Sequence, residues 1–152
     1  MLTHGSLFAG IGGFDYGFEK AGIKTSWQVE INAHARKILE LRFPKVERFG
    51  DVRLCSGLLD DKRKQARDRH ELAPVSIVTF GSPCQDLSIT GKRKGMAGGR
   101  SGLFFEAIRI IKEMRQATAN AYPRFTVWEN VPGAFSSNGG KDFHSVLQSL
   151  AD

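Results

Sequence analysis

The sequence predicts an α/β protein whose core is a mostly parallel, Rossmann-like sheet of about five strands. Two observations lead to this prediction. Short apolar runs alternate with stretches of helical periodicity along the 152 residues, which is the pattern of strand–helix–strand units. The predicted strands also end in a glycine turn or in a polar side chain, as strands do in folds that bind ligands at the carboxyl edge of the sheet.

Composition indicates one domain with a polyanionic partner. Hydrophobic residues make up 41% and charged residues 25% of the chain, which is ordinary for a globular protein. The 22 Lys and Arg residues outnumber the 16 Asp and Glu residues and give a net charge of +6, which suits a partner such as nucleic acid. The sequence has two cysteines, no secretory leader and no apolar run that could cross a bilayer, so we expect a cytoplasmic protein without a targeting signal.

The first predicted unit is a strand at 6–9, a glycine turn, and a helix that Gly22 closes. The glycines Gly10, Gly12 and Gly13 let the backbone approach a ligand at the start of the helix. Their spacing differs from the Gly-x-Gly-x-x-Gly of dinucleotide-binding proteins, so a pyrophosphate site is not supported. Plain close packing of a helix on a strand is the alternative. The apolar face of this helix is predicted at Phe14, Gly17, Phe18 and Ala21.

The second predicted strand, 24–29, ends at Glu30, which lies 20 residues after Gly10. A carboxylate at this position accepts hydrogen bonds from a ribose in Rossmann-like proteins. The alternative is an acid placed at the start of a helix, where the helix dipole favours it. Asn32 is the predicted N-cap of the next helix, which ends at Phe43-Pro44.

A weak third strand at 46–49 leads to Asp51. This carboxylate lies within reach of an adenine amino group if the strand order is 3-2-1-4-5. Residues 53–72 carry little information. Within them, the charge-dense run 60–71 is predicted as a solvated helix or a mobile loop, with His70 as a surface histidine.

The fourth predicted strand, 75–80, is followed by Gly81-Ser82-Pro83, which places Cys84 at the carboxyl edge of the sheet. A cysteine displayed in this way is a candidate nucleophile. An inert, half-buried thiol is the alternative, and a disulfide with Cys55 is possible on count alone. The connection 85–101 is rich in glycine and basic side chains, which is typical of a lid beside an active site.

A helix at 103–117 and a fifth strand at 125–128 complete the predicted sheet. The fifth strand delivers Glu129 to the same edge as Cys84, where a carboxylic acid can orient a ring nitrogen of a substrate. The alternative is an acid that only caps a helix. The last predicted helix, 141–150, turns four apolar side chains inward: Phe143, Val146, Leu147 and Leu150.

The motifs described above resemble those of the DNA (cytosine-5)-methyltransferases. The Ser-Pro-Cys-Gln block at 82–85, followed by Glu-Asn-Val at 129–131, is highly specific, and the resemblance runs from Ser6 to about Leu150. It implies an S-adenosylmethionine-dependent methyltransferase fold and an enzyme of bacterial or phage type, such as those of restriction–modification systems. The matching segments are 8–13, Glu30, 50–52, 81–88, 102–106 and 129–131.

The resemblance also implies roles for single residues. Cys84 would attack carbon 6 of a cytosine flipped out of double-stranded DNA, and Glu129 would hydrogen-bond ring nitrogen 3 and the exocyclic amine. Glu30 would hold the ribose of S-adenosylmethionine and Asp51 its adenine. The implied cofactor contacts are Phe8, Ala9, Gly10, Ile11, Gly12, Gly13, Glu30, Ile31, Asp51, Val52, Pro83 and Leu103. The implied DNA and lid contacts are Gln85, Ser88, Lys92, Arg93, Lys94 and Arg100.

Residues 1–152 match only the N-terminal part of the family's catalytic domain, which carries the cofactor site and the nucleophile. The target-recognition region and the C-terminal motifs are absent from it. We therefore expect the missing C-terminal half, or a second copy, to cover the free edge of the fifth strand. Two alternatives remain. One is a catalytically silent cofactor-binding or interaction module, either part of a split enzyme or a remnant. The other, a nicotinamide-dependent oxidoreductase, is disfavoured by the glycine spacing.

Overall fold

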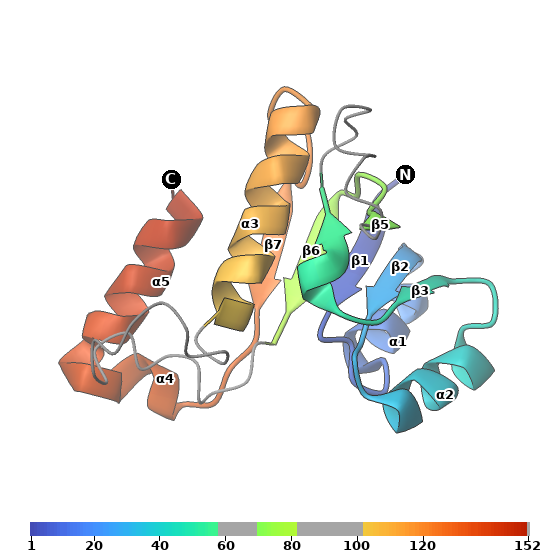
Figure 1. Cartoon of the computed structure of the whole chain (residues 1–152), viewed down its shortest axis with the longest axis horizontal. Coiled ribbons are helices and arrows are strands. Elements are labelled where there is room, and N and C mark those ends of the chain that lie inside the picture. The colour runs from blue at the N-terminus through green and yellow to red at the C-terminus, as the bar shows by residue number, and fades with distance from the viewer. Residues whose placement is uncertain (58–69, 82–101, 152) are drawn as a thin grey trace.

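Five strands form one parallel sheet in a computed structural model that describes residues 1–57, 70–81 and 102–151 (Figure 1). The strands are β1 (Thr3–Leu7), β2 (Lys24–Val29), β3 (Glu47–Phe49), β6 (Ile77–Phe80) and β7 (Phe125–Trp128). Their order is β3-β2-β1-β6-β7, and every neighbouring pair is parallel. The predicted fold class and strand order are confirmed. The switch point, where the direction of strand addition reverses, lies between β1 and β6.

Helices cover both faces of this sheet. They are α1 (Gly13–Lys20), α2 (Ala33–Arg42), α3 (Gly102–Ala117), α4 (Gly133–Ser136) and α5 (Lys141–Ala151), with the 3-10 turns η1 (Val52–Leu54) and η4 (Ser137–Gly140). Crossovers between parallel strands are right-handed, so α1 and α2 lie on one face and α3 lies on the other. Figure 1 shows α3 alongside β6 and β7, with α5 farther from the centre of the sheet.

The main core lies between the sheet and α3. It contains buried apolar side chains from three strands and from α3: Leu7, Trp27, Val29, Val78, Phe80, Phe104, Ile111 and Met114. A Cβ atom built on Gly5 would lie 2.3 Å from the indole ring of Trp27. Glycine is therefore required where β1 passes this ring, and the indole N–H is satisfied by the carbonyl of Ala73 at 2.8 Å.

A buried histidine ties the three central strands together on the α1 face. The ring nitrogens of His4 lie 3.0 Å from the hydroxyl of Thr25 on β2 and 2.9 Å from that of Thr79 on β6. Its ring stacks on Phe18 of α1 with the centroids 4.5 Å apart. Burial lowers the pKa of His4 to about 4, so the imidazole is neutral at pH 7.

Several predicted element boundaries are wrong. β1 ends at Leu7 instead of residue 9, because Phe8 adopts a left-handed φ of 56°. β3 and β6 begin at Glu47 and Ile77, later than predicted. Within 53–72 the structure has a small parallel ladder between β4 (Cys55–Ser56) and β5 (His70–Glu71) that was not predicted. The rest of the charge-dense run lies outside the described residues.

Two predicted apolar faces are wrong in part, and the short elements α4 and η4 were not predicted. In α5, Val146 is buried but Leu147 is 50% exposed, because it lies on the helix face away from the core. In α1, Phe14 is 37% exposed, whereas the buried residue is Asp15. The apolar face of α1 therefore does not enter the core. No helix in the described parts of the chain has the length and apolar character needed to span a membrane.

Candidate functional site

The turn after β1 is tightly folded against its neighbours. Phe8, Gly10 and Gly12 all have left-handed φ angles, of 56°, 56° and 86°. Phe8 is the costly one, because its side chain disfavours this region and such strain gathers at functional sites. A Cβ on Gly12 would lie 2.5 Å from the ring of Phe43, so glycine is required there by packing on α2. The turn thus serves close packing as well as an exposed backbone.

A buried carboxylate directly after this turn was not identified from the sequence. Asp15, in the first turn of α1, is fully buried and accepts hydrogen bonds from Ser6 on β1 at 3.1 Å and Gln28 on β2 at 3.0 Å. Burial raises the pKa of Asp15. The only sequence signal was an acid at a helix start, where the dipole favours it.

Glu30 connects the glycine turn to the start of α2. Its Oε2 accepts the Gly10 N–H at 2.8 Å, and its Oε1 accepts the Asn32 N–H at 2.7 Å. Asn32 caps α2, as predicted, by accepting the N–H groups of His34 and Ala35. Each carboxylate oxygen has two lone pairs, so Glu30 retains acceptor capacity for a ligand hydroxyl while fixing both backbone segments.

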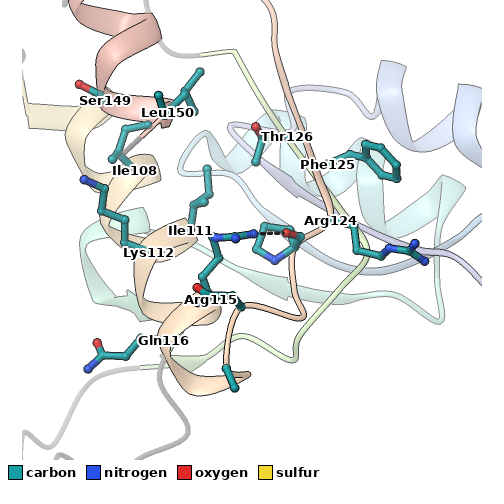
Figure 2. A pocket seen from close by; sticks show the side chains of 14 residues that line it. Ile108, Ile111, Lys112, Arg115, Gln116, Arg124, Phe125, Thr126, Ser149 and Leu150 are labelled. Carbon is teal, nitrogen blue, oxygen red and sulfur yellow. Dashed lines mark hydrogen bonds between the residues drawn. The ribbon is translucent and has the colours of Figure 1, made fainter.

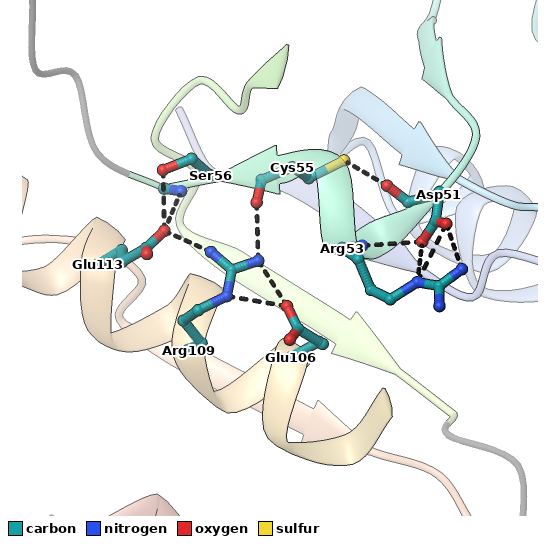
Figure 3. Close-up of polar contacts among 8 residues, drawn as sticks. Asp51, Arg53, Cys55, Ser56, Glu106, Arg109 and Glu113 are labelled. Atoms are coloured by element: carbon teal, nitrogen blue, oxygen red, sulfur yellow. Dashed lines mark hydrogen bonds and ion pairs between the residues drawn. The ribbon is translucent and has the colours of Figure 1, made fainter. Parts of the chain in front are cut away.

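Asp51 lies at the carboxyl end of β3 and is paired with Arg53 (Figure 3). The guanidinium donates from Nη2 to Oδ2 at 2.6 Å and from Nε to Oδ1 at 3.0 Å. The hydrogen bond from Arg53 lowers the pKa of Asp51, so the carboxylate is ionised at neutral pH and can accept further hydrogen bonds.

These side chains border a cavity of about 380 Å³ at the switch point of the sheet. Six of the residues predicted to contact a cofactor line it, together with Arg53 and Gly81: Phe8, Glu30, Ile31, Asp51, Val52 and Leu103. They come from the ends of β1, β2 and β3 and from the start of α3. Such a volume, with a few convergent polar groups, is typical of a small-molecule site.

A second cavity, of about 670 Å³, lies beside the first and is lined by residues of α1 and by Glu129. Phe8 and Gly81 border both cavities. The predicted residues Ala9 and Gly13 line the second one, beside the exposed apolar residues of α1, which explains why that face does not enter the core. Ile11, also predicted, is 52% exposed and lines neither cavity.

Glu129 follows β7, as predicted, and its exposed carboxylate lies against the end of β6. A Cβ on Gly81 would lie 2.7 Å from the Glu129 Oε2, so glycine at position 81 makes room for the carboxylate three residues before Cys84. The predicted residues Cys84, Pro83, Gln85, Ser88, Lys92, Arg93, Lys94 and Arg100 lie outside the described part of the chain.

The other cysteine is chemically inert. Cys55 is a free thiol, fully buried, and burial raises its pKa to about 12. Because the thiolate is the reactive form, Cys55 is not a nucleophile at neutral pH. Cys55 is therefore not in the disulfide with Cys84 that the cysteine count alone allowed. Among the described residues no group of three or more His, Cys, Asp or Glu side chains could hold a metal ion.

A third cavity, of about 870 Å³, lies elsewhere, between α3, the start of β7 and the end of α5 (Figure 2). It is lined by apolar residues such as Ile108 and Ile111 and by the cations Lys112, Arg115 and Arg124. Since Arg124 directly precedes β7, this cavity faces the amino end of the strand and not the end that carries Glu129.

Comparison with known proteins agrees with this geometry. Residues 2–152 match the family described as C-5 cytosine-specific DNA methylase. The chain is 33% identical over 147 residues to the type II methyltransferase M2.BsuMI of Bacillus subtilis, covering 97% of this chain and 33% of that protein. It is 29% identical over 139 residues to a DNA N-6-adenine-methyltransferase of Escherichia phage P1, covering 90% of this chain and 17% of that protein.

A crystal structure of a putative DNA modification methyltransferase encoded within a prophage of E. coli shares the fold. Its TM-score is 0.70 at 24% identity, with 99% of this chain and 38% of that chain covered. The chain thus spans less than half the length of each of these three proteins.

Proposed function

The chain belongs to the C-5 cytosine-specific DNA methylase family, and from this premise we propose that it carries the S-adenosylmethionine site and the nucleophile of a DNA cytosine-5 methyltransferase. The observation that carries the proposal is the placement of Glu30, Asp51 and Glu129 on two neighbouring cavities, bordered in common by Phe8 and Gly81, at the carboxyl edge of the sheet.

The residues present fit the adenosine part of S-adenosylmethionine. Glu30 and Asp51 are hydrogen-bond acceptors, which match ribose hydroxyls and an adenine amino group. The one cation on the described wall of the smaller cavity, Arg53, is already paired with Asp51. Two carboxylates and a cation that is already paired do not suit a pyrophosphate, and this argues against the nicotinamide-dependent alternative. The cofactor, when bound, supplies an electrophilic methyl group.

In the proposed reaction the Cys84 thiolate adds to carbon 6 of a flipped-out cytosine and forms a carbon–sulfur bond. The carboxyl group of Glu129 hydrogen-bonds ring nitrogen 3 and the exocyclic amine, which stabilises the electrons pushed into the ring. Carbon 5 then takes the methyl group, whose bond to the sulfonium sulfur of the cofactor breaks so that the electron pair stays on that sulfur. A base removes the proton from carbon 5, and the electron pair of that bond expels the thiolate. The basic side chains of 85–101 are proposed to contact DNA and to close over it.

The test is methyl transfer to DNA, with the C-terminal portion of a longer relative supplied in trans. We expect labelled methyl to appear in 5-methylcytosine after nucleoside digestion, and Cys84→Ser to reduce the rate by at least about 10³-fold. The P1 relative supports a second candidate, transfer to the amino group of adenine. Recovery of N6-methyladenine would favour it. A chain that binds the cofactor but methylates neither base in any combination would favour the silent module.

The proposal extends to a partner on the free edge of β7. Phe125 and Val127 are 56% and 38% exposed although parallel strands are normally buried, and Phe125 also lines the cavity of about 870 Å³ (Figure 2). We propose that further chain of the same enzyme, or a second copy, covers this edge. Sedimentation of the chain alone and with the C-terminal portion distinguishes the two. The cytoplasmic location stays a prediction.

A further inference from the structure

An ion-pair network on α3 holds the segment that follows η1 (Figure 3). The guanidinium of Arg109 lies at its centre. It pairs with Glu106 at 2.7 Å and with Glu113 at 2.9 Å, and it donates to the carbonyl of Cys55 at 2.8 Å. One side chain thus joins two acids of its own helix to the backbone of β4.

Glu113 extends the same network to the next two residues of the segment. Its Oε2 accepts the hydroxyl of Ser56 at 2.9 Å and the N–H of Gly57 at 3.0 Å. The two backbones lie unusually close here, because a Cβ on Gly57 would lie 2.4 Å from the carbonyl oxygen of Ile110 on α3. Three consecutive residues, 55–57, are therefore held against the helix.

This segment lies close in the chain to part of the lining of the smaller cavity. Asp51, Val52 and Arg53 line the cavity, and residues 55–57 follow after one intervening residue, the last of η1. Leu103, which also lines the cavity, belongs to α3 itself. The helix therefore contributes to the lining of the cavity and, through Arg109 and Glu113, also holds the segment that follows Asp51, Val52 and Arg53.

We propose that Arg109 and Glu113 are positioning residues that fix the spacing between η1 and α3 and so place the Asp51 carboxylate for adenine recognition. The inference rests on the proposed function, because adenine is the ligand group that Asp51 is assigned to bind. Neither residue lines the cavity, so both act on a ligand only through the segment 51–57.

The network is sheltered enough for its loss to matter. The side chains of Arg109 and Glu113 are 25% and 11% exposed. Burial favours the neutral form of Glu113, but hydrogen bonds from Arg109, Ser56 and the Gly57 N–H hold its pKa below the usual range. Arg109→Met would remove the hydrogen bond to the carbonyl of Cys55 and the 2.9 Å ion pair to the sheltered Glu113, and such a loss is destabilising locally.

The first test follows the segment itself, by alkylation of Cys55 in the full chain. This thiol is fully buried beside the network, so its modification reports local opening. Peptide mapping scores it separately from Cys84. We expect Arg109→Met to speed alkylation of Cys55 by at least about 10-fold. The matched control is Arg115→Met on the same helix, where the guanidinium donates to the carbonyl of Pro123; we expect less than about 2-fold there. Equal rates in the parent and Arg109→Met would overturn the proposal.

The second test isolates adenine recognition from general loosening. Binding of adenosine is compared with that of purine riboside, which lacks the 6-amino group. We expect the parent to prefer adenosine by about 10-fold, the worth of one hydrogen bond to a charged group. Arg109→Met should lose this preference, whereas a general loss of structure would weaken both ligands equally. A parent without the preference contradicts the role of Asp51 in the proposed function. A parent with it, beside a variant that keeps it in full, overturns the positioning role.

Discussion

β6 and β7 are adjacent parallel strands of four residues each, yet their surroundings are opposite. All four residues of β6 are buried, while none of those in β7 is. β6 pairs with β1 and β7, whereas β7 pairs only with β6 among the described residues. In the described part of the chain, side chains are therefore covered along β6 and exposed along β7, the strand that Glu129 follows.

This difference divides the site into two parts. The residues assigned to adenosine come from the ends of β1 to β3 and from α3, which are well packed. The carboxylate assigned to the reacting base comes from the open strand. We therefore expect cofactor binding to be a property of this chain, and base binding to require whatever covers β7.

The largest expected effect tests the two strands directly. Phe80→Ala on β6 removes a fully buried ring and should lower the free energy of unfolding by about 3–5 kcal/mol. Phe125→Ala on β7 removes a ring that is 56% exposed and should cost less than about 1 kcal/mol in the chain alone. Urea denaturation of both variants measures this. Similar losses would show that β7 is already covered in solution.

A somewhat smaller effect is expected in the pH dependence of the free energy of unfolding, through a buried side chain of the central strands. Burial sets the pKa of His4 at about 4 in the folded chain, against 6.5 for a free imidazole. Above pH 6.5 the ring is neutral in both states. Between pH 6.5 and 4 the unfolded chain takes up a proton that the folded chain refuses, so stability falls with falling pH, by about 3 kcal/mol in total.

The measurement is the free energy of unfolding between pH 4 and 7, in the parent and in His4→Gln. The variant should lack the part of the slope that this group contributes, while Asp15, whose pKa is raised by burial, titrates in both proteins. An NMR resonance of His4 that titrates near pH 6.5 in the folded chain would contradict the assignment.

The sequence predicted what depends on local chemistry. Apart from the strand order, which the Rossmann-like fold class implies, the predictions follow from apolar runs that end in turn residues. They include the strands, the N-cap at Asn32, the left-handed Gly22 that closes α1, and the placement of Glu30, Asp51 and Glu129 at one edge. These signals lie within a few residues of the feature they predict.

What the sequence did not predict depends on long-range packing. The Asp15–Ser6–Gln28 cluster and the three-strand contacts of His4 join residues that only the assembled sheet brings together. The charge spacing of Glu106, Arg109 and Glu113 indicates helical ion pairs, but not that they hold Cys55. The helical periodicity of α1 does not distinguish a side that faces the core from a side that lines a groove, because both are apolar.

The smallest expected effect concerns Glu30. Its measurement tests whether this chain alone binds the cofactor. Its two oxygens are engaged by Gly10 and Asn32, so the carboxylate could serve the backbone alone. Glu30→Gln keeps the shape and one carbonyl acceptor but removes the charge. If Glu30 also holds ribose, the affinity for S-adenosylhomocysteine should fall by about 10- to 100-fold, since hydrogen bonds to a charged group contribute about 1.5–3 kcal/mol.

The matched control for calorimetric titration is Glu40→Gln. Glu40 is an exposed acid on α2 that lines neither of the two neighbouring cavities. Equal affinities in the two variants, with unchanged thermal stability, would assign Glu30 to the backbone only. No binding by the parent chain would show instead that the cofactor site, like β7, depends on a partner.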